Sequence, residues 1–179
     1  MRNLEIEFKC PINKKEYETL INKFGLKDNV YLLTNYYFDS VDKVLHKNRT
    51  VLRIRQKHSN NLYKITLKQD TPQGALESHV FLKEKQALNL IENGFNLNDF
   101  FDEDLEVIFY GKLDNYRVST PYREGELFLD RIEYFDKVEY EIEYEVDNFE
   151  DGEINFNKFL EENNIKKAPF KRKSQRILE

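Results

Sequence analysis

The chain has 179 residues, of which 40% are hydrophobic and 34% charged, and its formal net charge is −5. This length fits one domain, residues 1–179, with a substantial buried core. The acidic balance argues against a nonspecific nucleic-acid-binding protein. The single Cys10 excludes an internal disulfide framework, and no apolar run reaches the roughly 18–20 residues of a membrane span. No signal-peptide pattern follows Met1. We therefore expect a cytoplasmic protein that binds neither nucleic acid nor membrane.

The hydrophobic periodicity predicts mostly strands, with a few helices. Residues 3–9 alternate as a strand that Pro11 is expected to end. Asn13 and Glu16 have the spacing of a capping box, and one helix follows, up to about Phe24. Further strands are expected near residues 30–38, 50–57, 62–68, 76–81, 111–119, 126–134 and 137–147, and further helices near 82–92, 154–163 and 170–178. Residues 96–104 are expected to form a short helix or a loop.

The number and spacing of these strands indicate a fold class. Short connections imply antiparallel pairing, and about eight antiparallel strands can close into a barrel wide enough to hold a ligand. We therefore expect an α+β fold, namely an eight-stranded antiparallel closed β-barrel with helices packed outside.

Charged residues alternate with apolar residues on four strands, and their signs are sorted by strand. Side chains two residues apart share a face. The first strand places on one face Glu5, Glu7 and Lys9. The strand near 138–146 has one acidic face, with Glu139, Glu141, Glu143 and Glu145. The two middle strands have basic faces, with Arg53, Arg55 and Lys57 on one, and Lys64 and Lys68 beside Thr66 on the other.

A sheet with one solvated face would explain any single strand. It does not explain the sorting, because like charges in a row repel unless an opposite charge lies between them. We therefore expect the apolar faces to point outward under the helices and the charged faces to line a cavity. There the carboxylates would bind a divalent cation, and the Arg and Lys side chains a polyanion. A cation beside a polyphosphate is the arrangement that phosphoryl transfer requires.

The order of several motifs resembles that of the CYTH superfamily, the triphosphate tunnel metalloenzymes. Glu5-x-Glu7-x-Lys9 is similar to the ExExK signature of this family. Further landmarks follow in the family's order: YYFDS at 36–40, LRIR at 52–55, ITLK at 65–68, LxLD at 127–130, EIE at 141–143, and K-x-x-R at Lys173 and Arg176. The resemblance implies a barrel whose tunnel binds a triphosphate together with Mg²⁺ or Mn²⁺.

The resemblance also implies roles for individual residues. The metal ligands would be Glu5, Glu7, Asp130, Glu141 and Glu143. The phosphate ligands would be Arg53, Arg55, Lys68, Arg117, Lys173 and Arg176, with Glu77 as a further lining residue. The catalytic residues would be Lys9, Glu7 and Lys68. Because Glu139 and Glu145 share a face with Glu141 and Glu143, the residues alone leave the register of the metal-binding pair open. Arg172 stands where the terminal motif of the family has serine.

The implied activity is metal-dependent hydrolysis of inorganic tripolyphosphate or of an organic triphosphate such as thiamine triphosphate. One alternative is a class IV-type adenylate cyclase, which converts ATP to cyclic AMP and pyrophosphate. Another is a noncatalytic module that binds polyphosphate or a nucleotide. We favour hydrolysis because no nucleobase pocket can be identified, and because a module that only binds anions would not need the full acidic set.

The remaining motifs and reactive residues do not indicate a further catalytic or metal site. No GxxxxGKS/T phosphate loop is present. Cys10 has no identifiable base nearby, and His46, His58 and His79 lack the spacing of metal ligands. The oligomeric state stays open, with a homodimer as one candidate.

Overall fold

The structure is a computed structural model that describes residues 2–179. Its strands are β1 (Arg2–Ile12), β2 (Tyr31–Asp39), β3 (Thr50–Lys57), β4 (Leu62–Thr71), β5 (Gly74–Leu82), β6 (Phe95–Asn96), β7 (Glu106–Tyr122), β8 (Gly125–Tyr134) and β9 (Lys137–Val146). Its helices are α1 (Lys14–Lys23), α2 (Val44–Lys47), α3 (Glu84–Asn93), α4 (Phe149–Glu162) and α5 (Lys173–Leu178), with two 3-10 helices, η1 (Lys27–Asn29) and η2 (Leu97–Asp99). No helix within residues 2–179 is long and apolar enough to cross a membrane.

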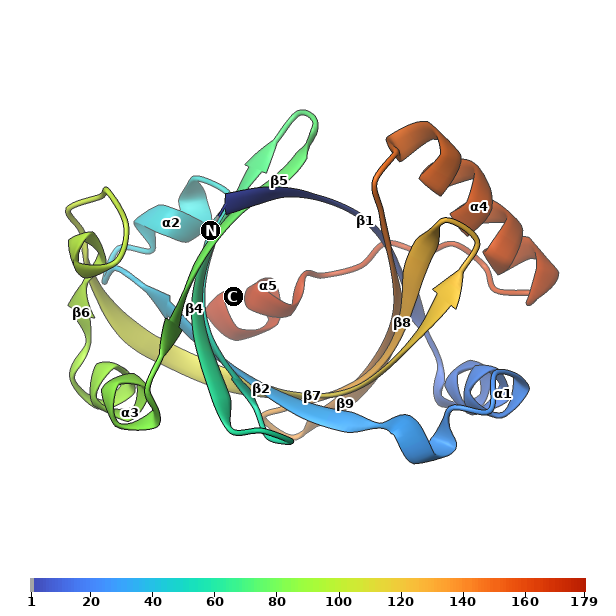
Figure 1. Ribbon diagram of the computed structural model, residues 1–179, viewed down its shortest axis with the longest axis horizontal. Helices are drawn as coiled ribbons and strands as arrows, with labels where there is room; N and C mark the ends of the chain where they lie inside the picture. The colour runs from blue at the N-terminus through green and yellow to red at the C-terminus, as the bar shows by residue number, and fades with distance from the viewer. Residues whose placement is uncertain (1) are drawn as a thin grey trace. The chain divides into compact units, whose positions relative to one another are not determined.

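The strands form one antiparallel sheet that closes on itself. They pair in the order β2-β3-β4-β5-β1-β9-β8-β7-β6, and β2 also pairs with β7 (Figure 1). This last pairing closes an eight-stranded barrel, to which the two-residue β6 is attached beside β7. The α+β barrel expected from the sequence is therefore confirmed.

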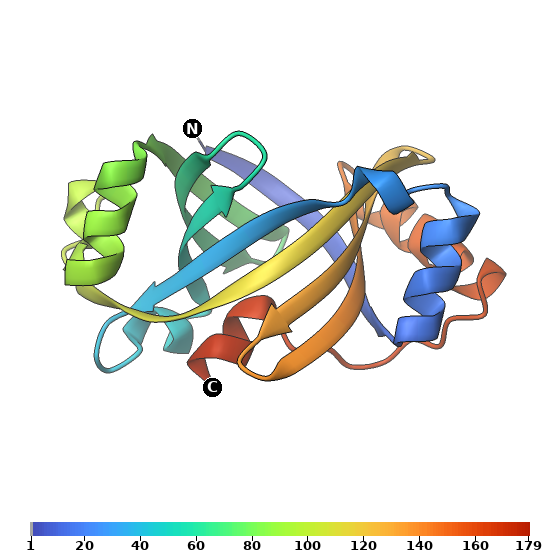
Figure 2. The same ribbon diagram turned by 90° about the horizontal axis from the view of Figure 1, so that it is seen from below.

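The described chain divides into two compact units. Unit 1 comprises residues 2–4, 33–114 and 172–179, and unit 2 comprises residues 5–32 and 115–171. Strands β1, β2 and β7 have residues in both units, and Figure 2 shows β7, in yellow, as one continuous strand. Each unit has its own hydrophobic core.

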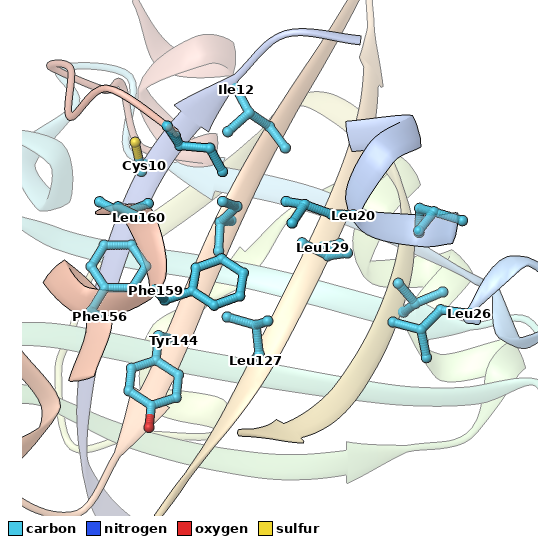
Figure 3. Close-up of a cluster of buried hydrophobic side chains, with 14 residues drawn as sticks. Cys10, Ile12, Leu20, Leu26, Leu127, Leu129, Tyr144, Phe156, Phe159 and Leu160 are labelled. Carbon is cyan, nitrogen blue, oxygen red and sulfur yellow. The ribbon is translucent and has the colours of Figure 1, made fainter. Parts of the chain in front are cut away.

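The core of unit 2 lies under α1 and α4 (Figure 3). Strand residues Leu127, Leu129 and Tyr144 pack with Leu20 of α1 and Phe156 of α4. The apolar face of β1 joins this core, since the ring of Phe8 lies 5.9 Å from that of Phe156 and 5.3 Å from that of Phe149. The predicted capping box starts α1, with Asn13 Oδ1 accepting from the Glu16 N–H at 2.8 Å and Glu16 Oε1 accepting from the Asn13 N–H at 3.0 Å. Phe8 of the first strand thus packs under a helix, as expected, whereas Leu4 on the same face is 50% exposed.

The core of unit 1 follows the same plan. Apolar residues of β3 and β4, including Leu52, Ile54 and Ile65, pack with Leu45 of α2 and with Ala87 of α3. Because side chains alternate along a strand, the charged residues of β3 and β4 lie on the opposite face.

Several element boundaries differ from the expectation. β1 continues through Pro11, which lies opposite Glu141, to Ile12; a strand accommodates proline where the ladder needs no N–H donor. β7 begins at Glu106 rather than at 111, and α5 begins at Lys173 rather than at 170. α4 begins at Phe149 rather than at 154, since the side chain of Asn148 caps the helix by accepting from the Asp151 N–H at 3.0 Å.

Helix α2 was not expected. The buried Asp39 carboxylate accepts backbone N–H groups from Ser40 at 2.7 Å, from Leu45 at 3.0 Å and from His46 at 2.9 Å. These bonds satisfy donors that a four-residue helix cannot pair by itself, which explains why this short helix forms.

Candidate functional site

The charged faces of β1, β9 and β8 in unit 2 meet in cross-strand rows. Residues that are paired across a ladder share a face of the sheet. The rows are Glu7–Glu145–Glu126, Lys9–Glu143–Phe128 and Pro11–Glu141–Asp130. Glu126 and Glu145 also line a cavity of about 320 Å³. The first row holds three carboxylates side by side, an arrangement that favours the binding of a cation.

Asp130, Glu141 and Glu143 form a buried carboxylate cluster. Their exposed fractions are 0%, 1% and 5%, and each offers an oxygen within 4.8 Å of the others. Buried carboxylates this close together are the donor set that hard divalent cations bind, so these residues fit a metal ion. The structure therefore brings together three of the five predicted metal ligands.

The cluster also shows which of the four glutamates of β9 lie beside Asp130. Glu141 and Glu143 are buried beside Asp130, whereas Glu139 Oε1 accepts a hydrogen bond from the Tyr134 hydroxyl at 2.7 Å. Glu5 and Glu7 of β1 lie on the same charged face but outside the three-carboxylate cluster.

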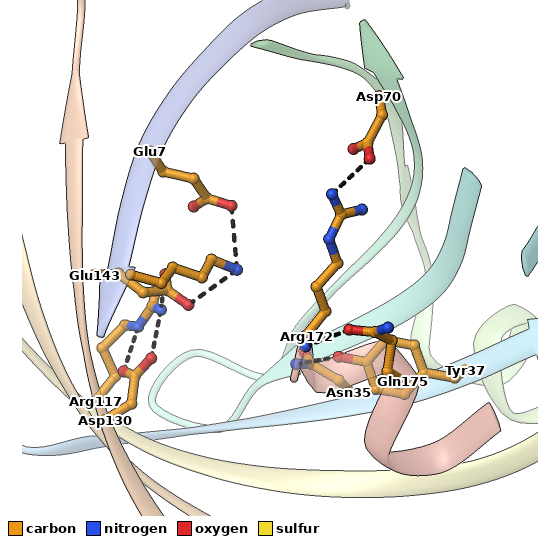
Figure 4. Close-up of polar contacts among 10 residues, drawn as sticks. Glu7, Asn35, Tyr37, Asp70, Arg117, Asp130, Glu143, Arg172 and Gln175 are labelled. Atoms are coloured by element: carbon orange, nitrogen blue, oxygen red, sulfur yellow. Dashed lines mark hydrogen bonds and ion pairs between the residues drawn. The ribbon is translucent and has the colours of Figure 1, made fainter. Parts of the chain in front are cut away.

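Arg117 holds two members of this cluster (Figure 4). Its Nε and Nη2 donate to the two oxygens of Asp130, each at 2.7 Å, and Nη2 also donates to Glu143 Oε2 at 2.7 Å. The guanidinium carbon lies 4.3 Å from the ring centroid of Phe128. Burial lowers the pKa of Arg117, but the carboxylates of Asp130 and Glu143 outweigh burial and raise it well above its usual value. Arg117 is thus a permanent cation inside the acidic cluster.

Lys9 is the second cation of this face. Its Nζ lies 3.2 Å from Glu7 Oε1 and 3.5 Å from Glu143 Oε1. Burial alone would lower the pKa of Lys9, but Glu143, Glu7 and Glu141 together raise it. Lys9 therefore stays protonated at neutral pH, so it can orient or neutralise an anion but cannot act there as a general base.

The basic face of unit 1 is built in the same way from cross-strand rows. These rows are Asn35–Arg55–Lys64–Phe81, Tyr37–Arg53–Thr66–His79 and Val51–Lys68–Glu77. Three predicted phosphate ligands, Arg53, Arg55 and Lys68, therefore share one face, and the predicted lining residue Glu77 lies opposite Lys68. Lys173 and Arg176 are buried on α5 in the same unit.

Hydrogen bonds fix part of this basic face. Arg55 Nε donates to Asn35 Oδ1 at 2.8 Å. Asn35 Nδ2 in turn donates to the Tyr37 hydroxyl at 3.2 Å (Figure 4). Arg53 differs, because its buried Nε has no hydrogen-bond partner among the residues that the structure describes. Arg55 is therefore held in place, whereas Arg53 keeps a donor available.

Arg172 anchors the start of α5. Its Nη2 lies 2.5 Å from Asp70 Oδ2 (Figure 4). Arg49 Nε lies 3.2 Å from the same oxygen. The Arg172 N–H donates to Gln175 Oε1 at 2.7 Å. The residue that replaces serine in the terminal motif thus fixes the helix that carries Lys173 and Arg176.

Sequence reasoning gave no role to several polar residues that the structure places near these groups. They are Asn35, Thr66, Asp70 and Asn115. Asn115 is fully buried on the same face of β7 as Arg117, and neither of its side-chain polar atoms has a partner within residues 2–179. Strand parity alone could have flagged Thr66, between Lys64 and Lys68, and Asn115. Nothing in the sequence pairs Asp70 with Arg172, 102 residues away.

The CYTH domain profile matches residues 3–178, nearly the whole chain. The chain belongs to the CYTH family. This CYTH protein is 30% identical to YjbK of Bacillus subtilis, provisionally named a triphosphatase, over 99% of the chain and 96% of the relative. A crystal structure from Bacillus halodurans, provisionally named an adenylate cyclase, is 29% identical, with a TM-score of 0.90 and 99% of each chain covered.

A more distant solved structure shares the fold of this protein. HpAC1 from Hippeastrum is 21% identical, with a TM-score of 0.72, and the match covers 98% of this chain and 95% of that one.

Proposed function

We propose that this CYTH protein acts as a single domain that hydrolyses a small triphosphate with the help of a divalent cation, Mg²⁺ or Mn²⁺. The buried cluster of Asp130, Glu141 and Glu143 carries the proposal. These three carboxylates are buried and lie within 4.8 Å of one another, which is the donor set that a hard divalent cation binds. A module that only bound anions would have no use for this buried acidic cluster.

The metal ligands in this proposal are Asp130, Glu141 and Glu143, joined by Glu5 and Glu7 of β1. Carboxylate oxygens are the ligands that Mg²⁺ and Mn²⁺ prefer. A bound cation would supply charge neutralisation at the phosphate oxygens and lower the pKa of bound water.

The phosphate ligands in this proposal are Arg53, Arg55 and Lys68, with Lys173 and Arg176 of α5. Arginine suits this role because its planar N–H groups match phosphate oxygens in pairs. Arg117, which the family resemblance also implies as a phosphate ligand, donates to Asp130 and Glu143.

Among the three predicted catalytic residues, Lys9 and Lys68 would act as cations. The raised pKa of Lys9 keeps its ammonium group charged, so it would orient the attacking water or stabilise the transferred phosphoryl group. Glu7 would hold Lys9 in place, 3.2 Å away, in addition to binding the metal.

Adenylate cyclase activity is the second candidate, because the 29% identical relative carries that provisional name. The 30% identical relative, by contrast, carries the name of a triphosphatase. Both reactions need the same metal and phosphate ligands, so products must separate them.

The test is to incubate the protein with tripolyphosphate, thiamine triphosphate and ATP, each with Mg²⁺ or Mn²⁺. Release of orthophosphate supports hydrolysis, whereas cyclic AMP with pyrophosphate supports the cyclase. No product from any substrate would leave a binding module as the remaining function.

A matched pair of variants tests the metal ligands. Glu7→Gln should abolish metal-dependent turnover and leave the fold intact. Glu18→Gln removes the same charge from the exposed surface of α1 and should change nothing. Near-wild-type activity of Glu7→Gln at limiting metal would contradict the role of Glu7.

A further inference from the structure

Thr66 lies at the centre of a cross of basic side chains in unit 1. Arg53 of β3 is directly opposite on one side, and His79 of β5 is directly opposite on the other. Lys64 and Lys68 lie two residues away along β4, on the same face. Four basic neighbours therefore surround one neutral hydroxyl.

The Thr66 hydroxyl lacks the hydrogen bond that a buried hydroxyl normally makes. Thr66 is 1% exposed, and its Oγ1 has no partner within residues 2–179. The Nε of Arg53, its cross-strand neighbour, is likewise buried without a partner. A buried polar group left unpaired costs about 1–3 kcal/mol, so two such groups in adjacent positions call for an explanation.

The hydrogen-bonding chemistry of Arg53 Nε and the Thr66 hydroxyl defines which partner would satisfy both. Arg Nε carries only a donor, and a threonine hydroxyl can donate or accept. They do not bond to each other, so one acceptor atom placed between them would satisfy both donors. With the cations of Arg53, Lys64 and Lys68 around it, an oxygen that bears negative charge is favoured over a neutral one.

We propose that the Thr66 hydroxyl is a further substrate-binding group, which donates together with Arg53 Nε to one phosphoryl oxygen of the triphosphate. This inference rests on the proposed function and adds a neutral donor to its cationic ligands. A hydroxyl suits this position because a further cation would repel Arg53, Lys64 and Lys68. Since Thr66 is covered, one of the long basic side chains beside it must turn aside when the anion binds, and Arg and Lys have the rotatable bonds to do so.

The experiment compares Thr66→Val, Thr66→Ser and wild type for tripolyphosphate affinity by calorimetry in EDTA, so that metal binding does not contribute. Valine keeps the shape and removes the hydroxyl. Thr66→Val should lose about tenfold in affinity, the effect of one hydrogen bond to a charged group. Its melting temperature without tripolyphosphate should stay the same or rise, because an unpaired hydroxyl has been removed. Thr66→Ser should behave like wild type.

Thr50→Val is the matched control. Thr50 lies on the core side of β3, and its hydroxyl donates to the Asn48 carbonyl at 3.2 Å. This variant should melt earlier and bind tripolyphosphate with unchanged affinity, the reverse of Thr66→Val.

Two outcomes would overturn the inference, and they are distinguishable. If Thr66→Val binds as tightly as wild type, water rather than a phosphoryl oxygen completes the pair, and the proposed triphosphatase function is untouched. If wild type itself does not bind tripolyphosphate, the proposed function fails as well. In the first case, earlier melting of Thr66→Val would show in addition that the hydroxyl stabilises the fold.

Discussion

Arg117 and Asp130 form a two-pronged ion pair, with Nε and Nη2 each 2.7 Å from a carboxylate oxygen of Asp130. Asp130 is fully buried, and the same Nη2 also reaches Glu143. One arginine thus fixes the orientation of two carboxylates in the cluster proposed to bind metal. Arg117 also offsets the cost of burying these carboxylates, since a buried charge requires a partner of opposite sign.

Replacing Arg117 should leave the negative charge of the cluster without its compensating cation. Arg117→Leu leaves Asp130 and Glu143 without their shared donor, so we expect a loss of about 3–5 kcal/mol in the free energy of unfolding. Mg²⁺ or Mn²⁺ should restore stability and raise the melting temperature of the variant more than that of wild type.

Arg131→Leu is the control for this experiment. Arg131 pairs with Glu133 at a partly exposed position of the same unit, so its loss should cost at most about 1 kcal/mol and respond little to metal. Equal metal responses of Arg117→Leu and wild type would contradict a cation site at the cluster.

The Asp70–Arg172 ion pair should affect tripolyphosphate affinity by holding α5 in place. Arg172→Ala removes the anchor of the helix that carries Lys173 and Arg176, so tripolyphosphate affinity should fall several-fold. The ion pair is partly exposed, so the loss of stability should stay within about 1 kcal/mol.

Arg172→Ser restores the residue of the family motif. Serine at a helix N-cap accepts a backbone N–H of the first turn, so this variant should recover much of the affinity lost in Arg172→Ala. Calorimetry in low and high salt tests the idea, because only the wild-type anchor is an ion pair. Equal loss in both variants would show that the side chain of Arg172 itself binds phosphate.

His79 should make stability depend on pH. Burial lowers its pKa, nearby Lys64 lowers it further, and Glu77 raises it only in part. The unfolded chain therefore takes up the proton first, and stability should fall as the pH drops below about 6.5 toward the lower folded pKa. Urea unfolding from pH 8 to 5 should show a smaller loss for His79→Gln than for wild type.

A bound polyanion should reverse this shift at His79. Negative charge beside the imidazole favours its protonated form, so tripolyphosphate should raise the pKa of His79 in an NMR titration. His46 and His58 provide internal references, as the chain has three histidines. An unmoved His79 would place the polyanion away from this row.

Gly152 tests how α4 packs. A Cβ there would lie 2.5 Å from Val146 Cγ2 and 2.9 Å from Phe8 Cε2. Gly152→Ala should therefore destabilise the protein by about 1–3 kcal/mol through overpacking, despite alanine's higher helix propensity. Lys158→Ala, on the exposed side of α4, should be nearly neutral. Thermal unfolding decides between them, and a stabilised Gly152→Ala would contradict this contact.

The sequence by itself determined which residues share a face. Strand periodicity is local, so the alternation in residues 50–57 correctly separated core side chains from charged ones. In residues 4–9 it did so for Phe8, whereas Leu4 is exposed. The capping box at Asn13 and Glu16 is equally local, and it was confirmed. The order of the motifs also predicted the barrel, because the family resemblance spans nearly the whole chain.

Only the tertiary structure decided which charges meet. Periodicity of two leaves the register between strands free, so four glutamates of β9 were equivalent until pairing placed Glu141 opposite Asp130. The same holds for Arg117 between Asp130 and Glu143, for Asp70 with Arg172, and for Thr66 opposite Arg53. These contacts depend on strand register and on chain segments far apart in sequence, which no local pattern encodes.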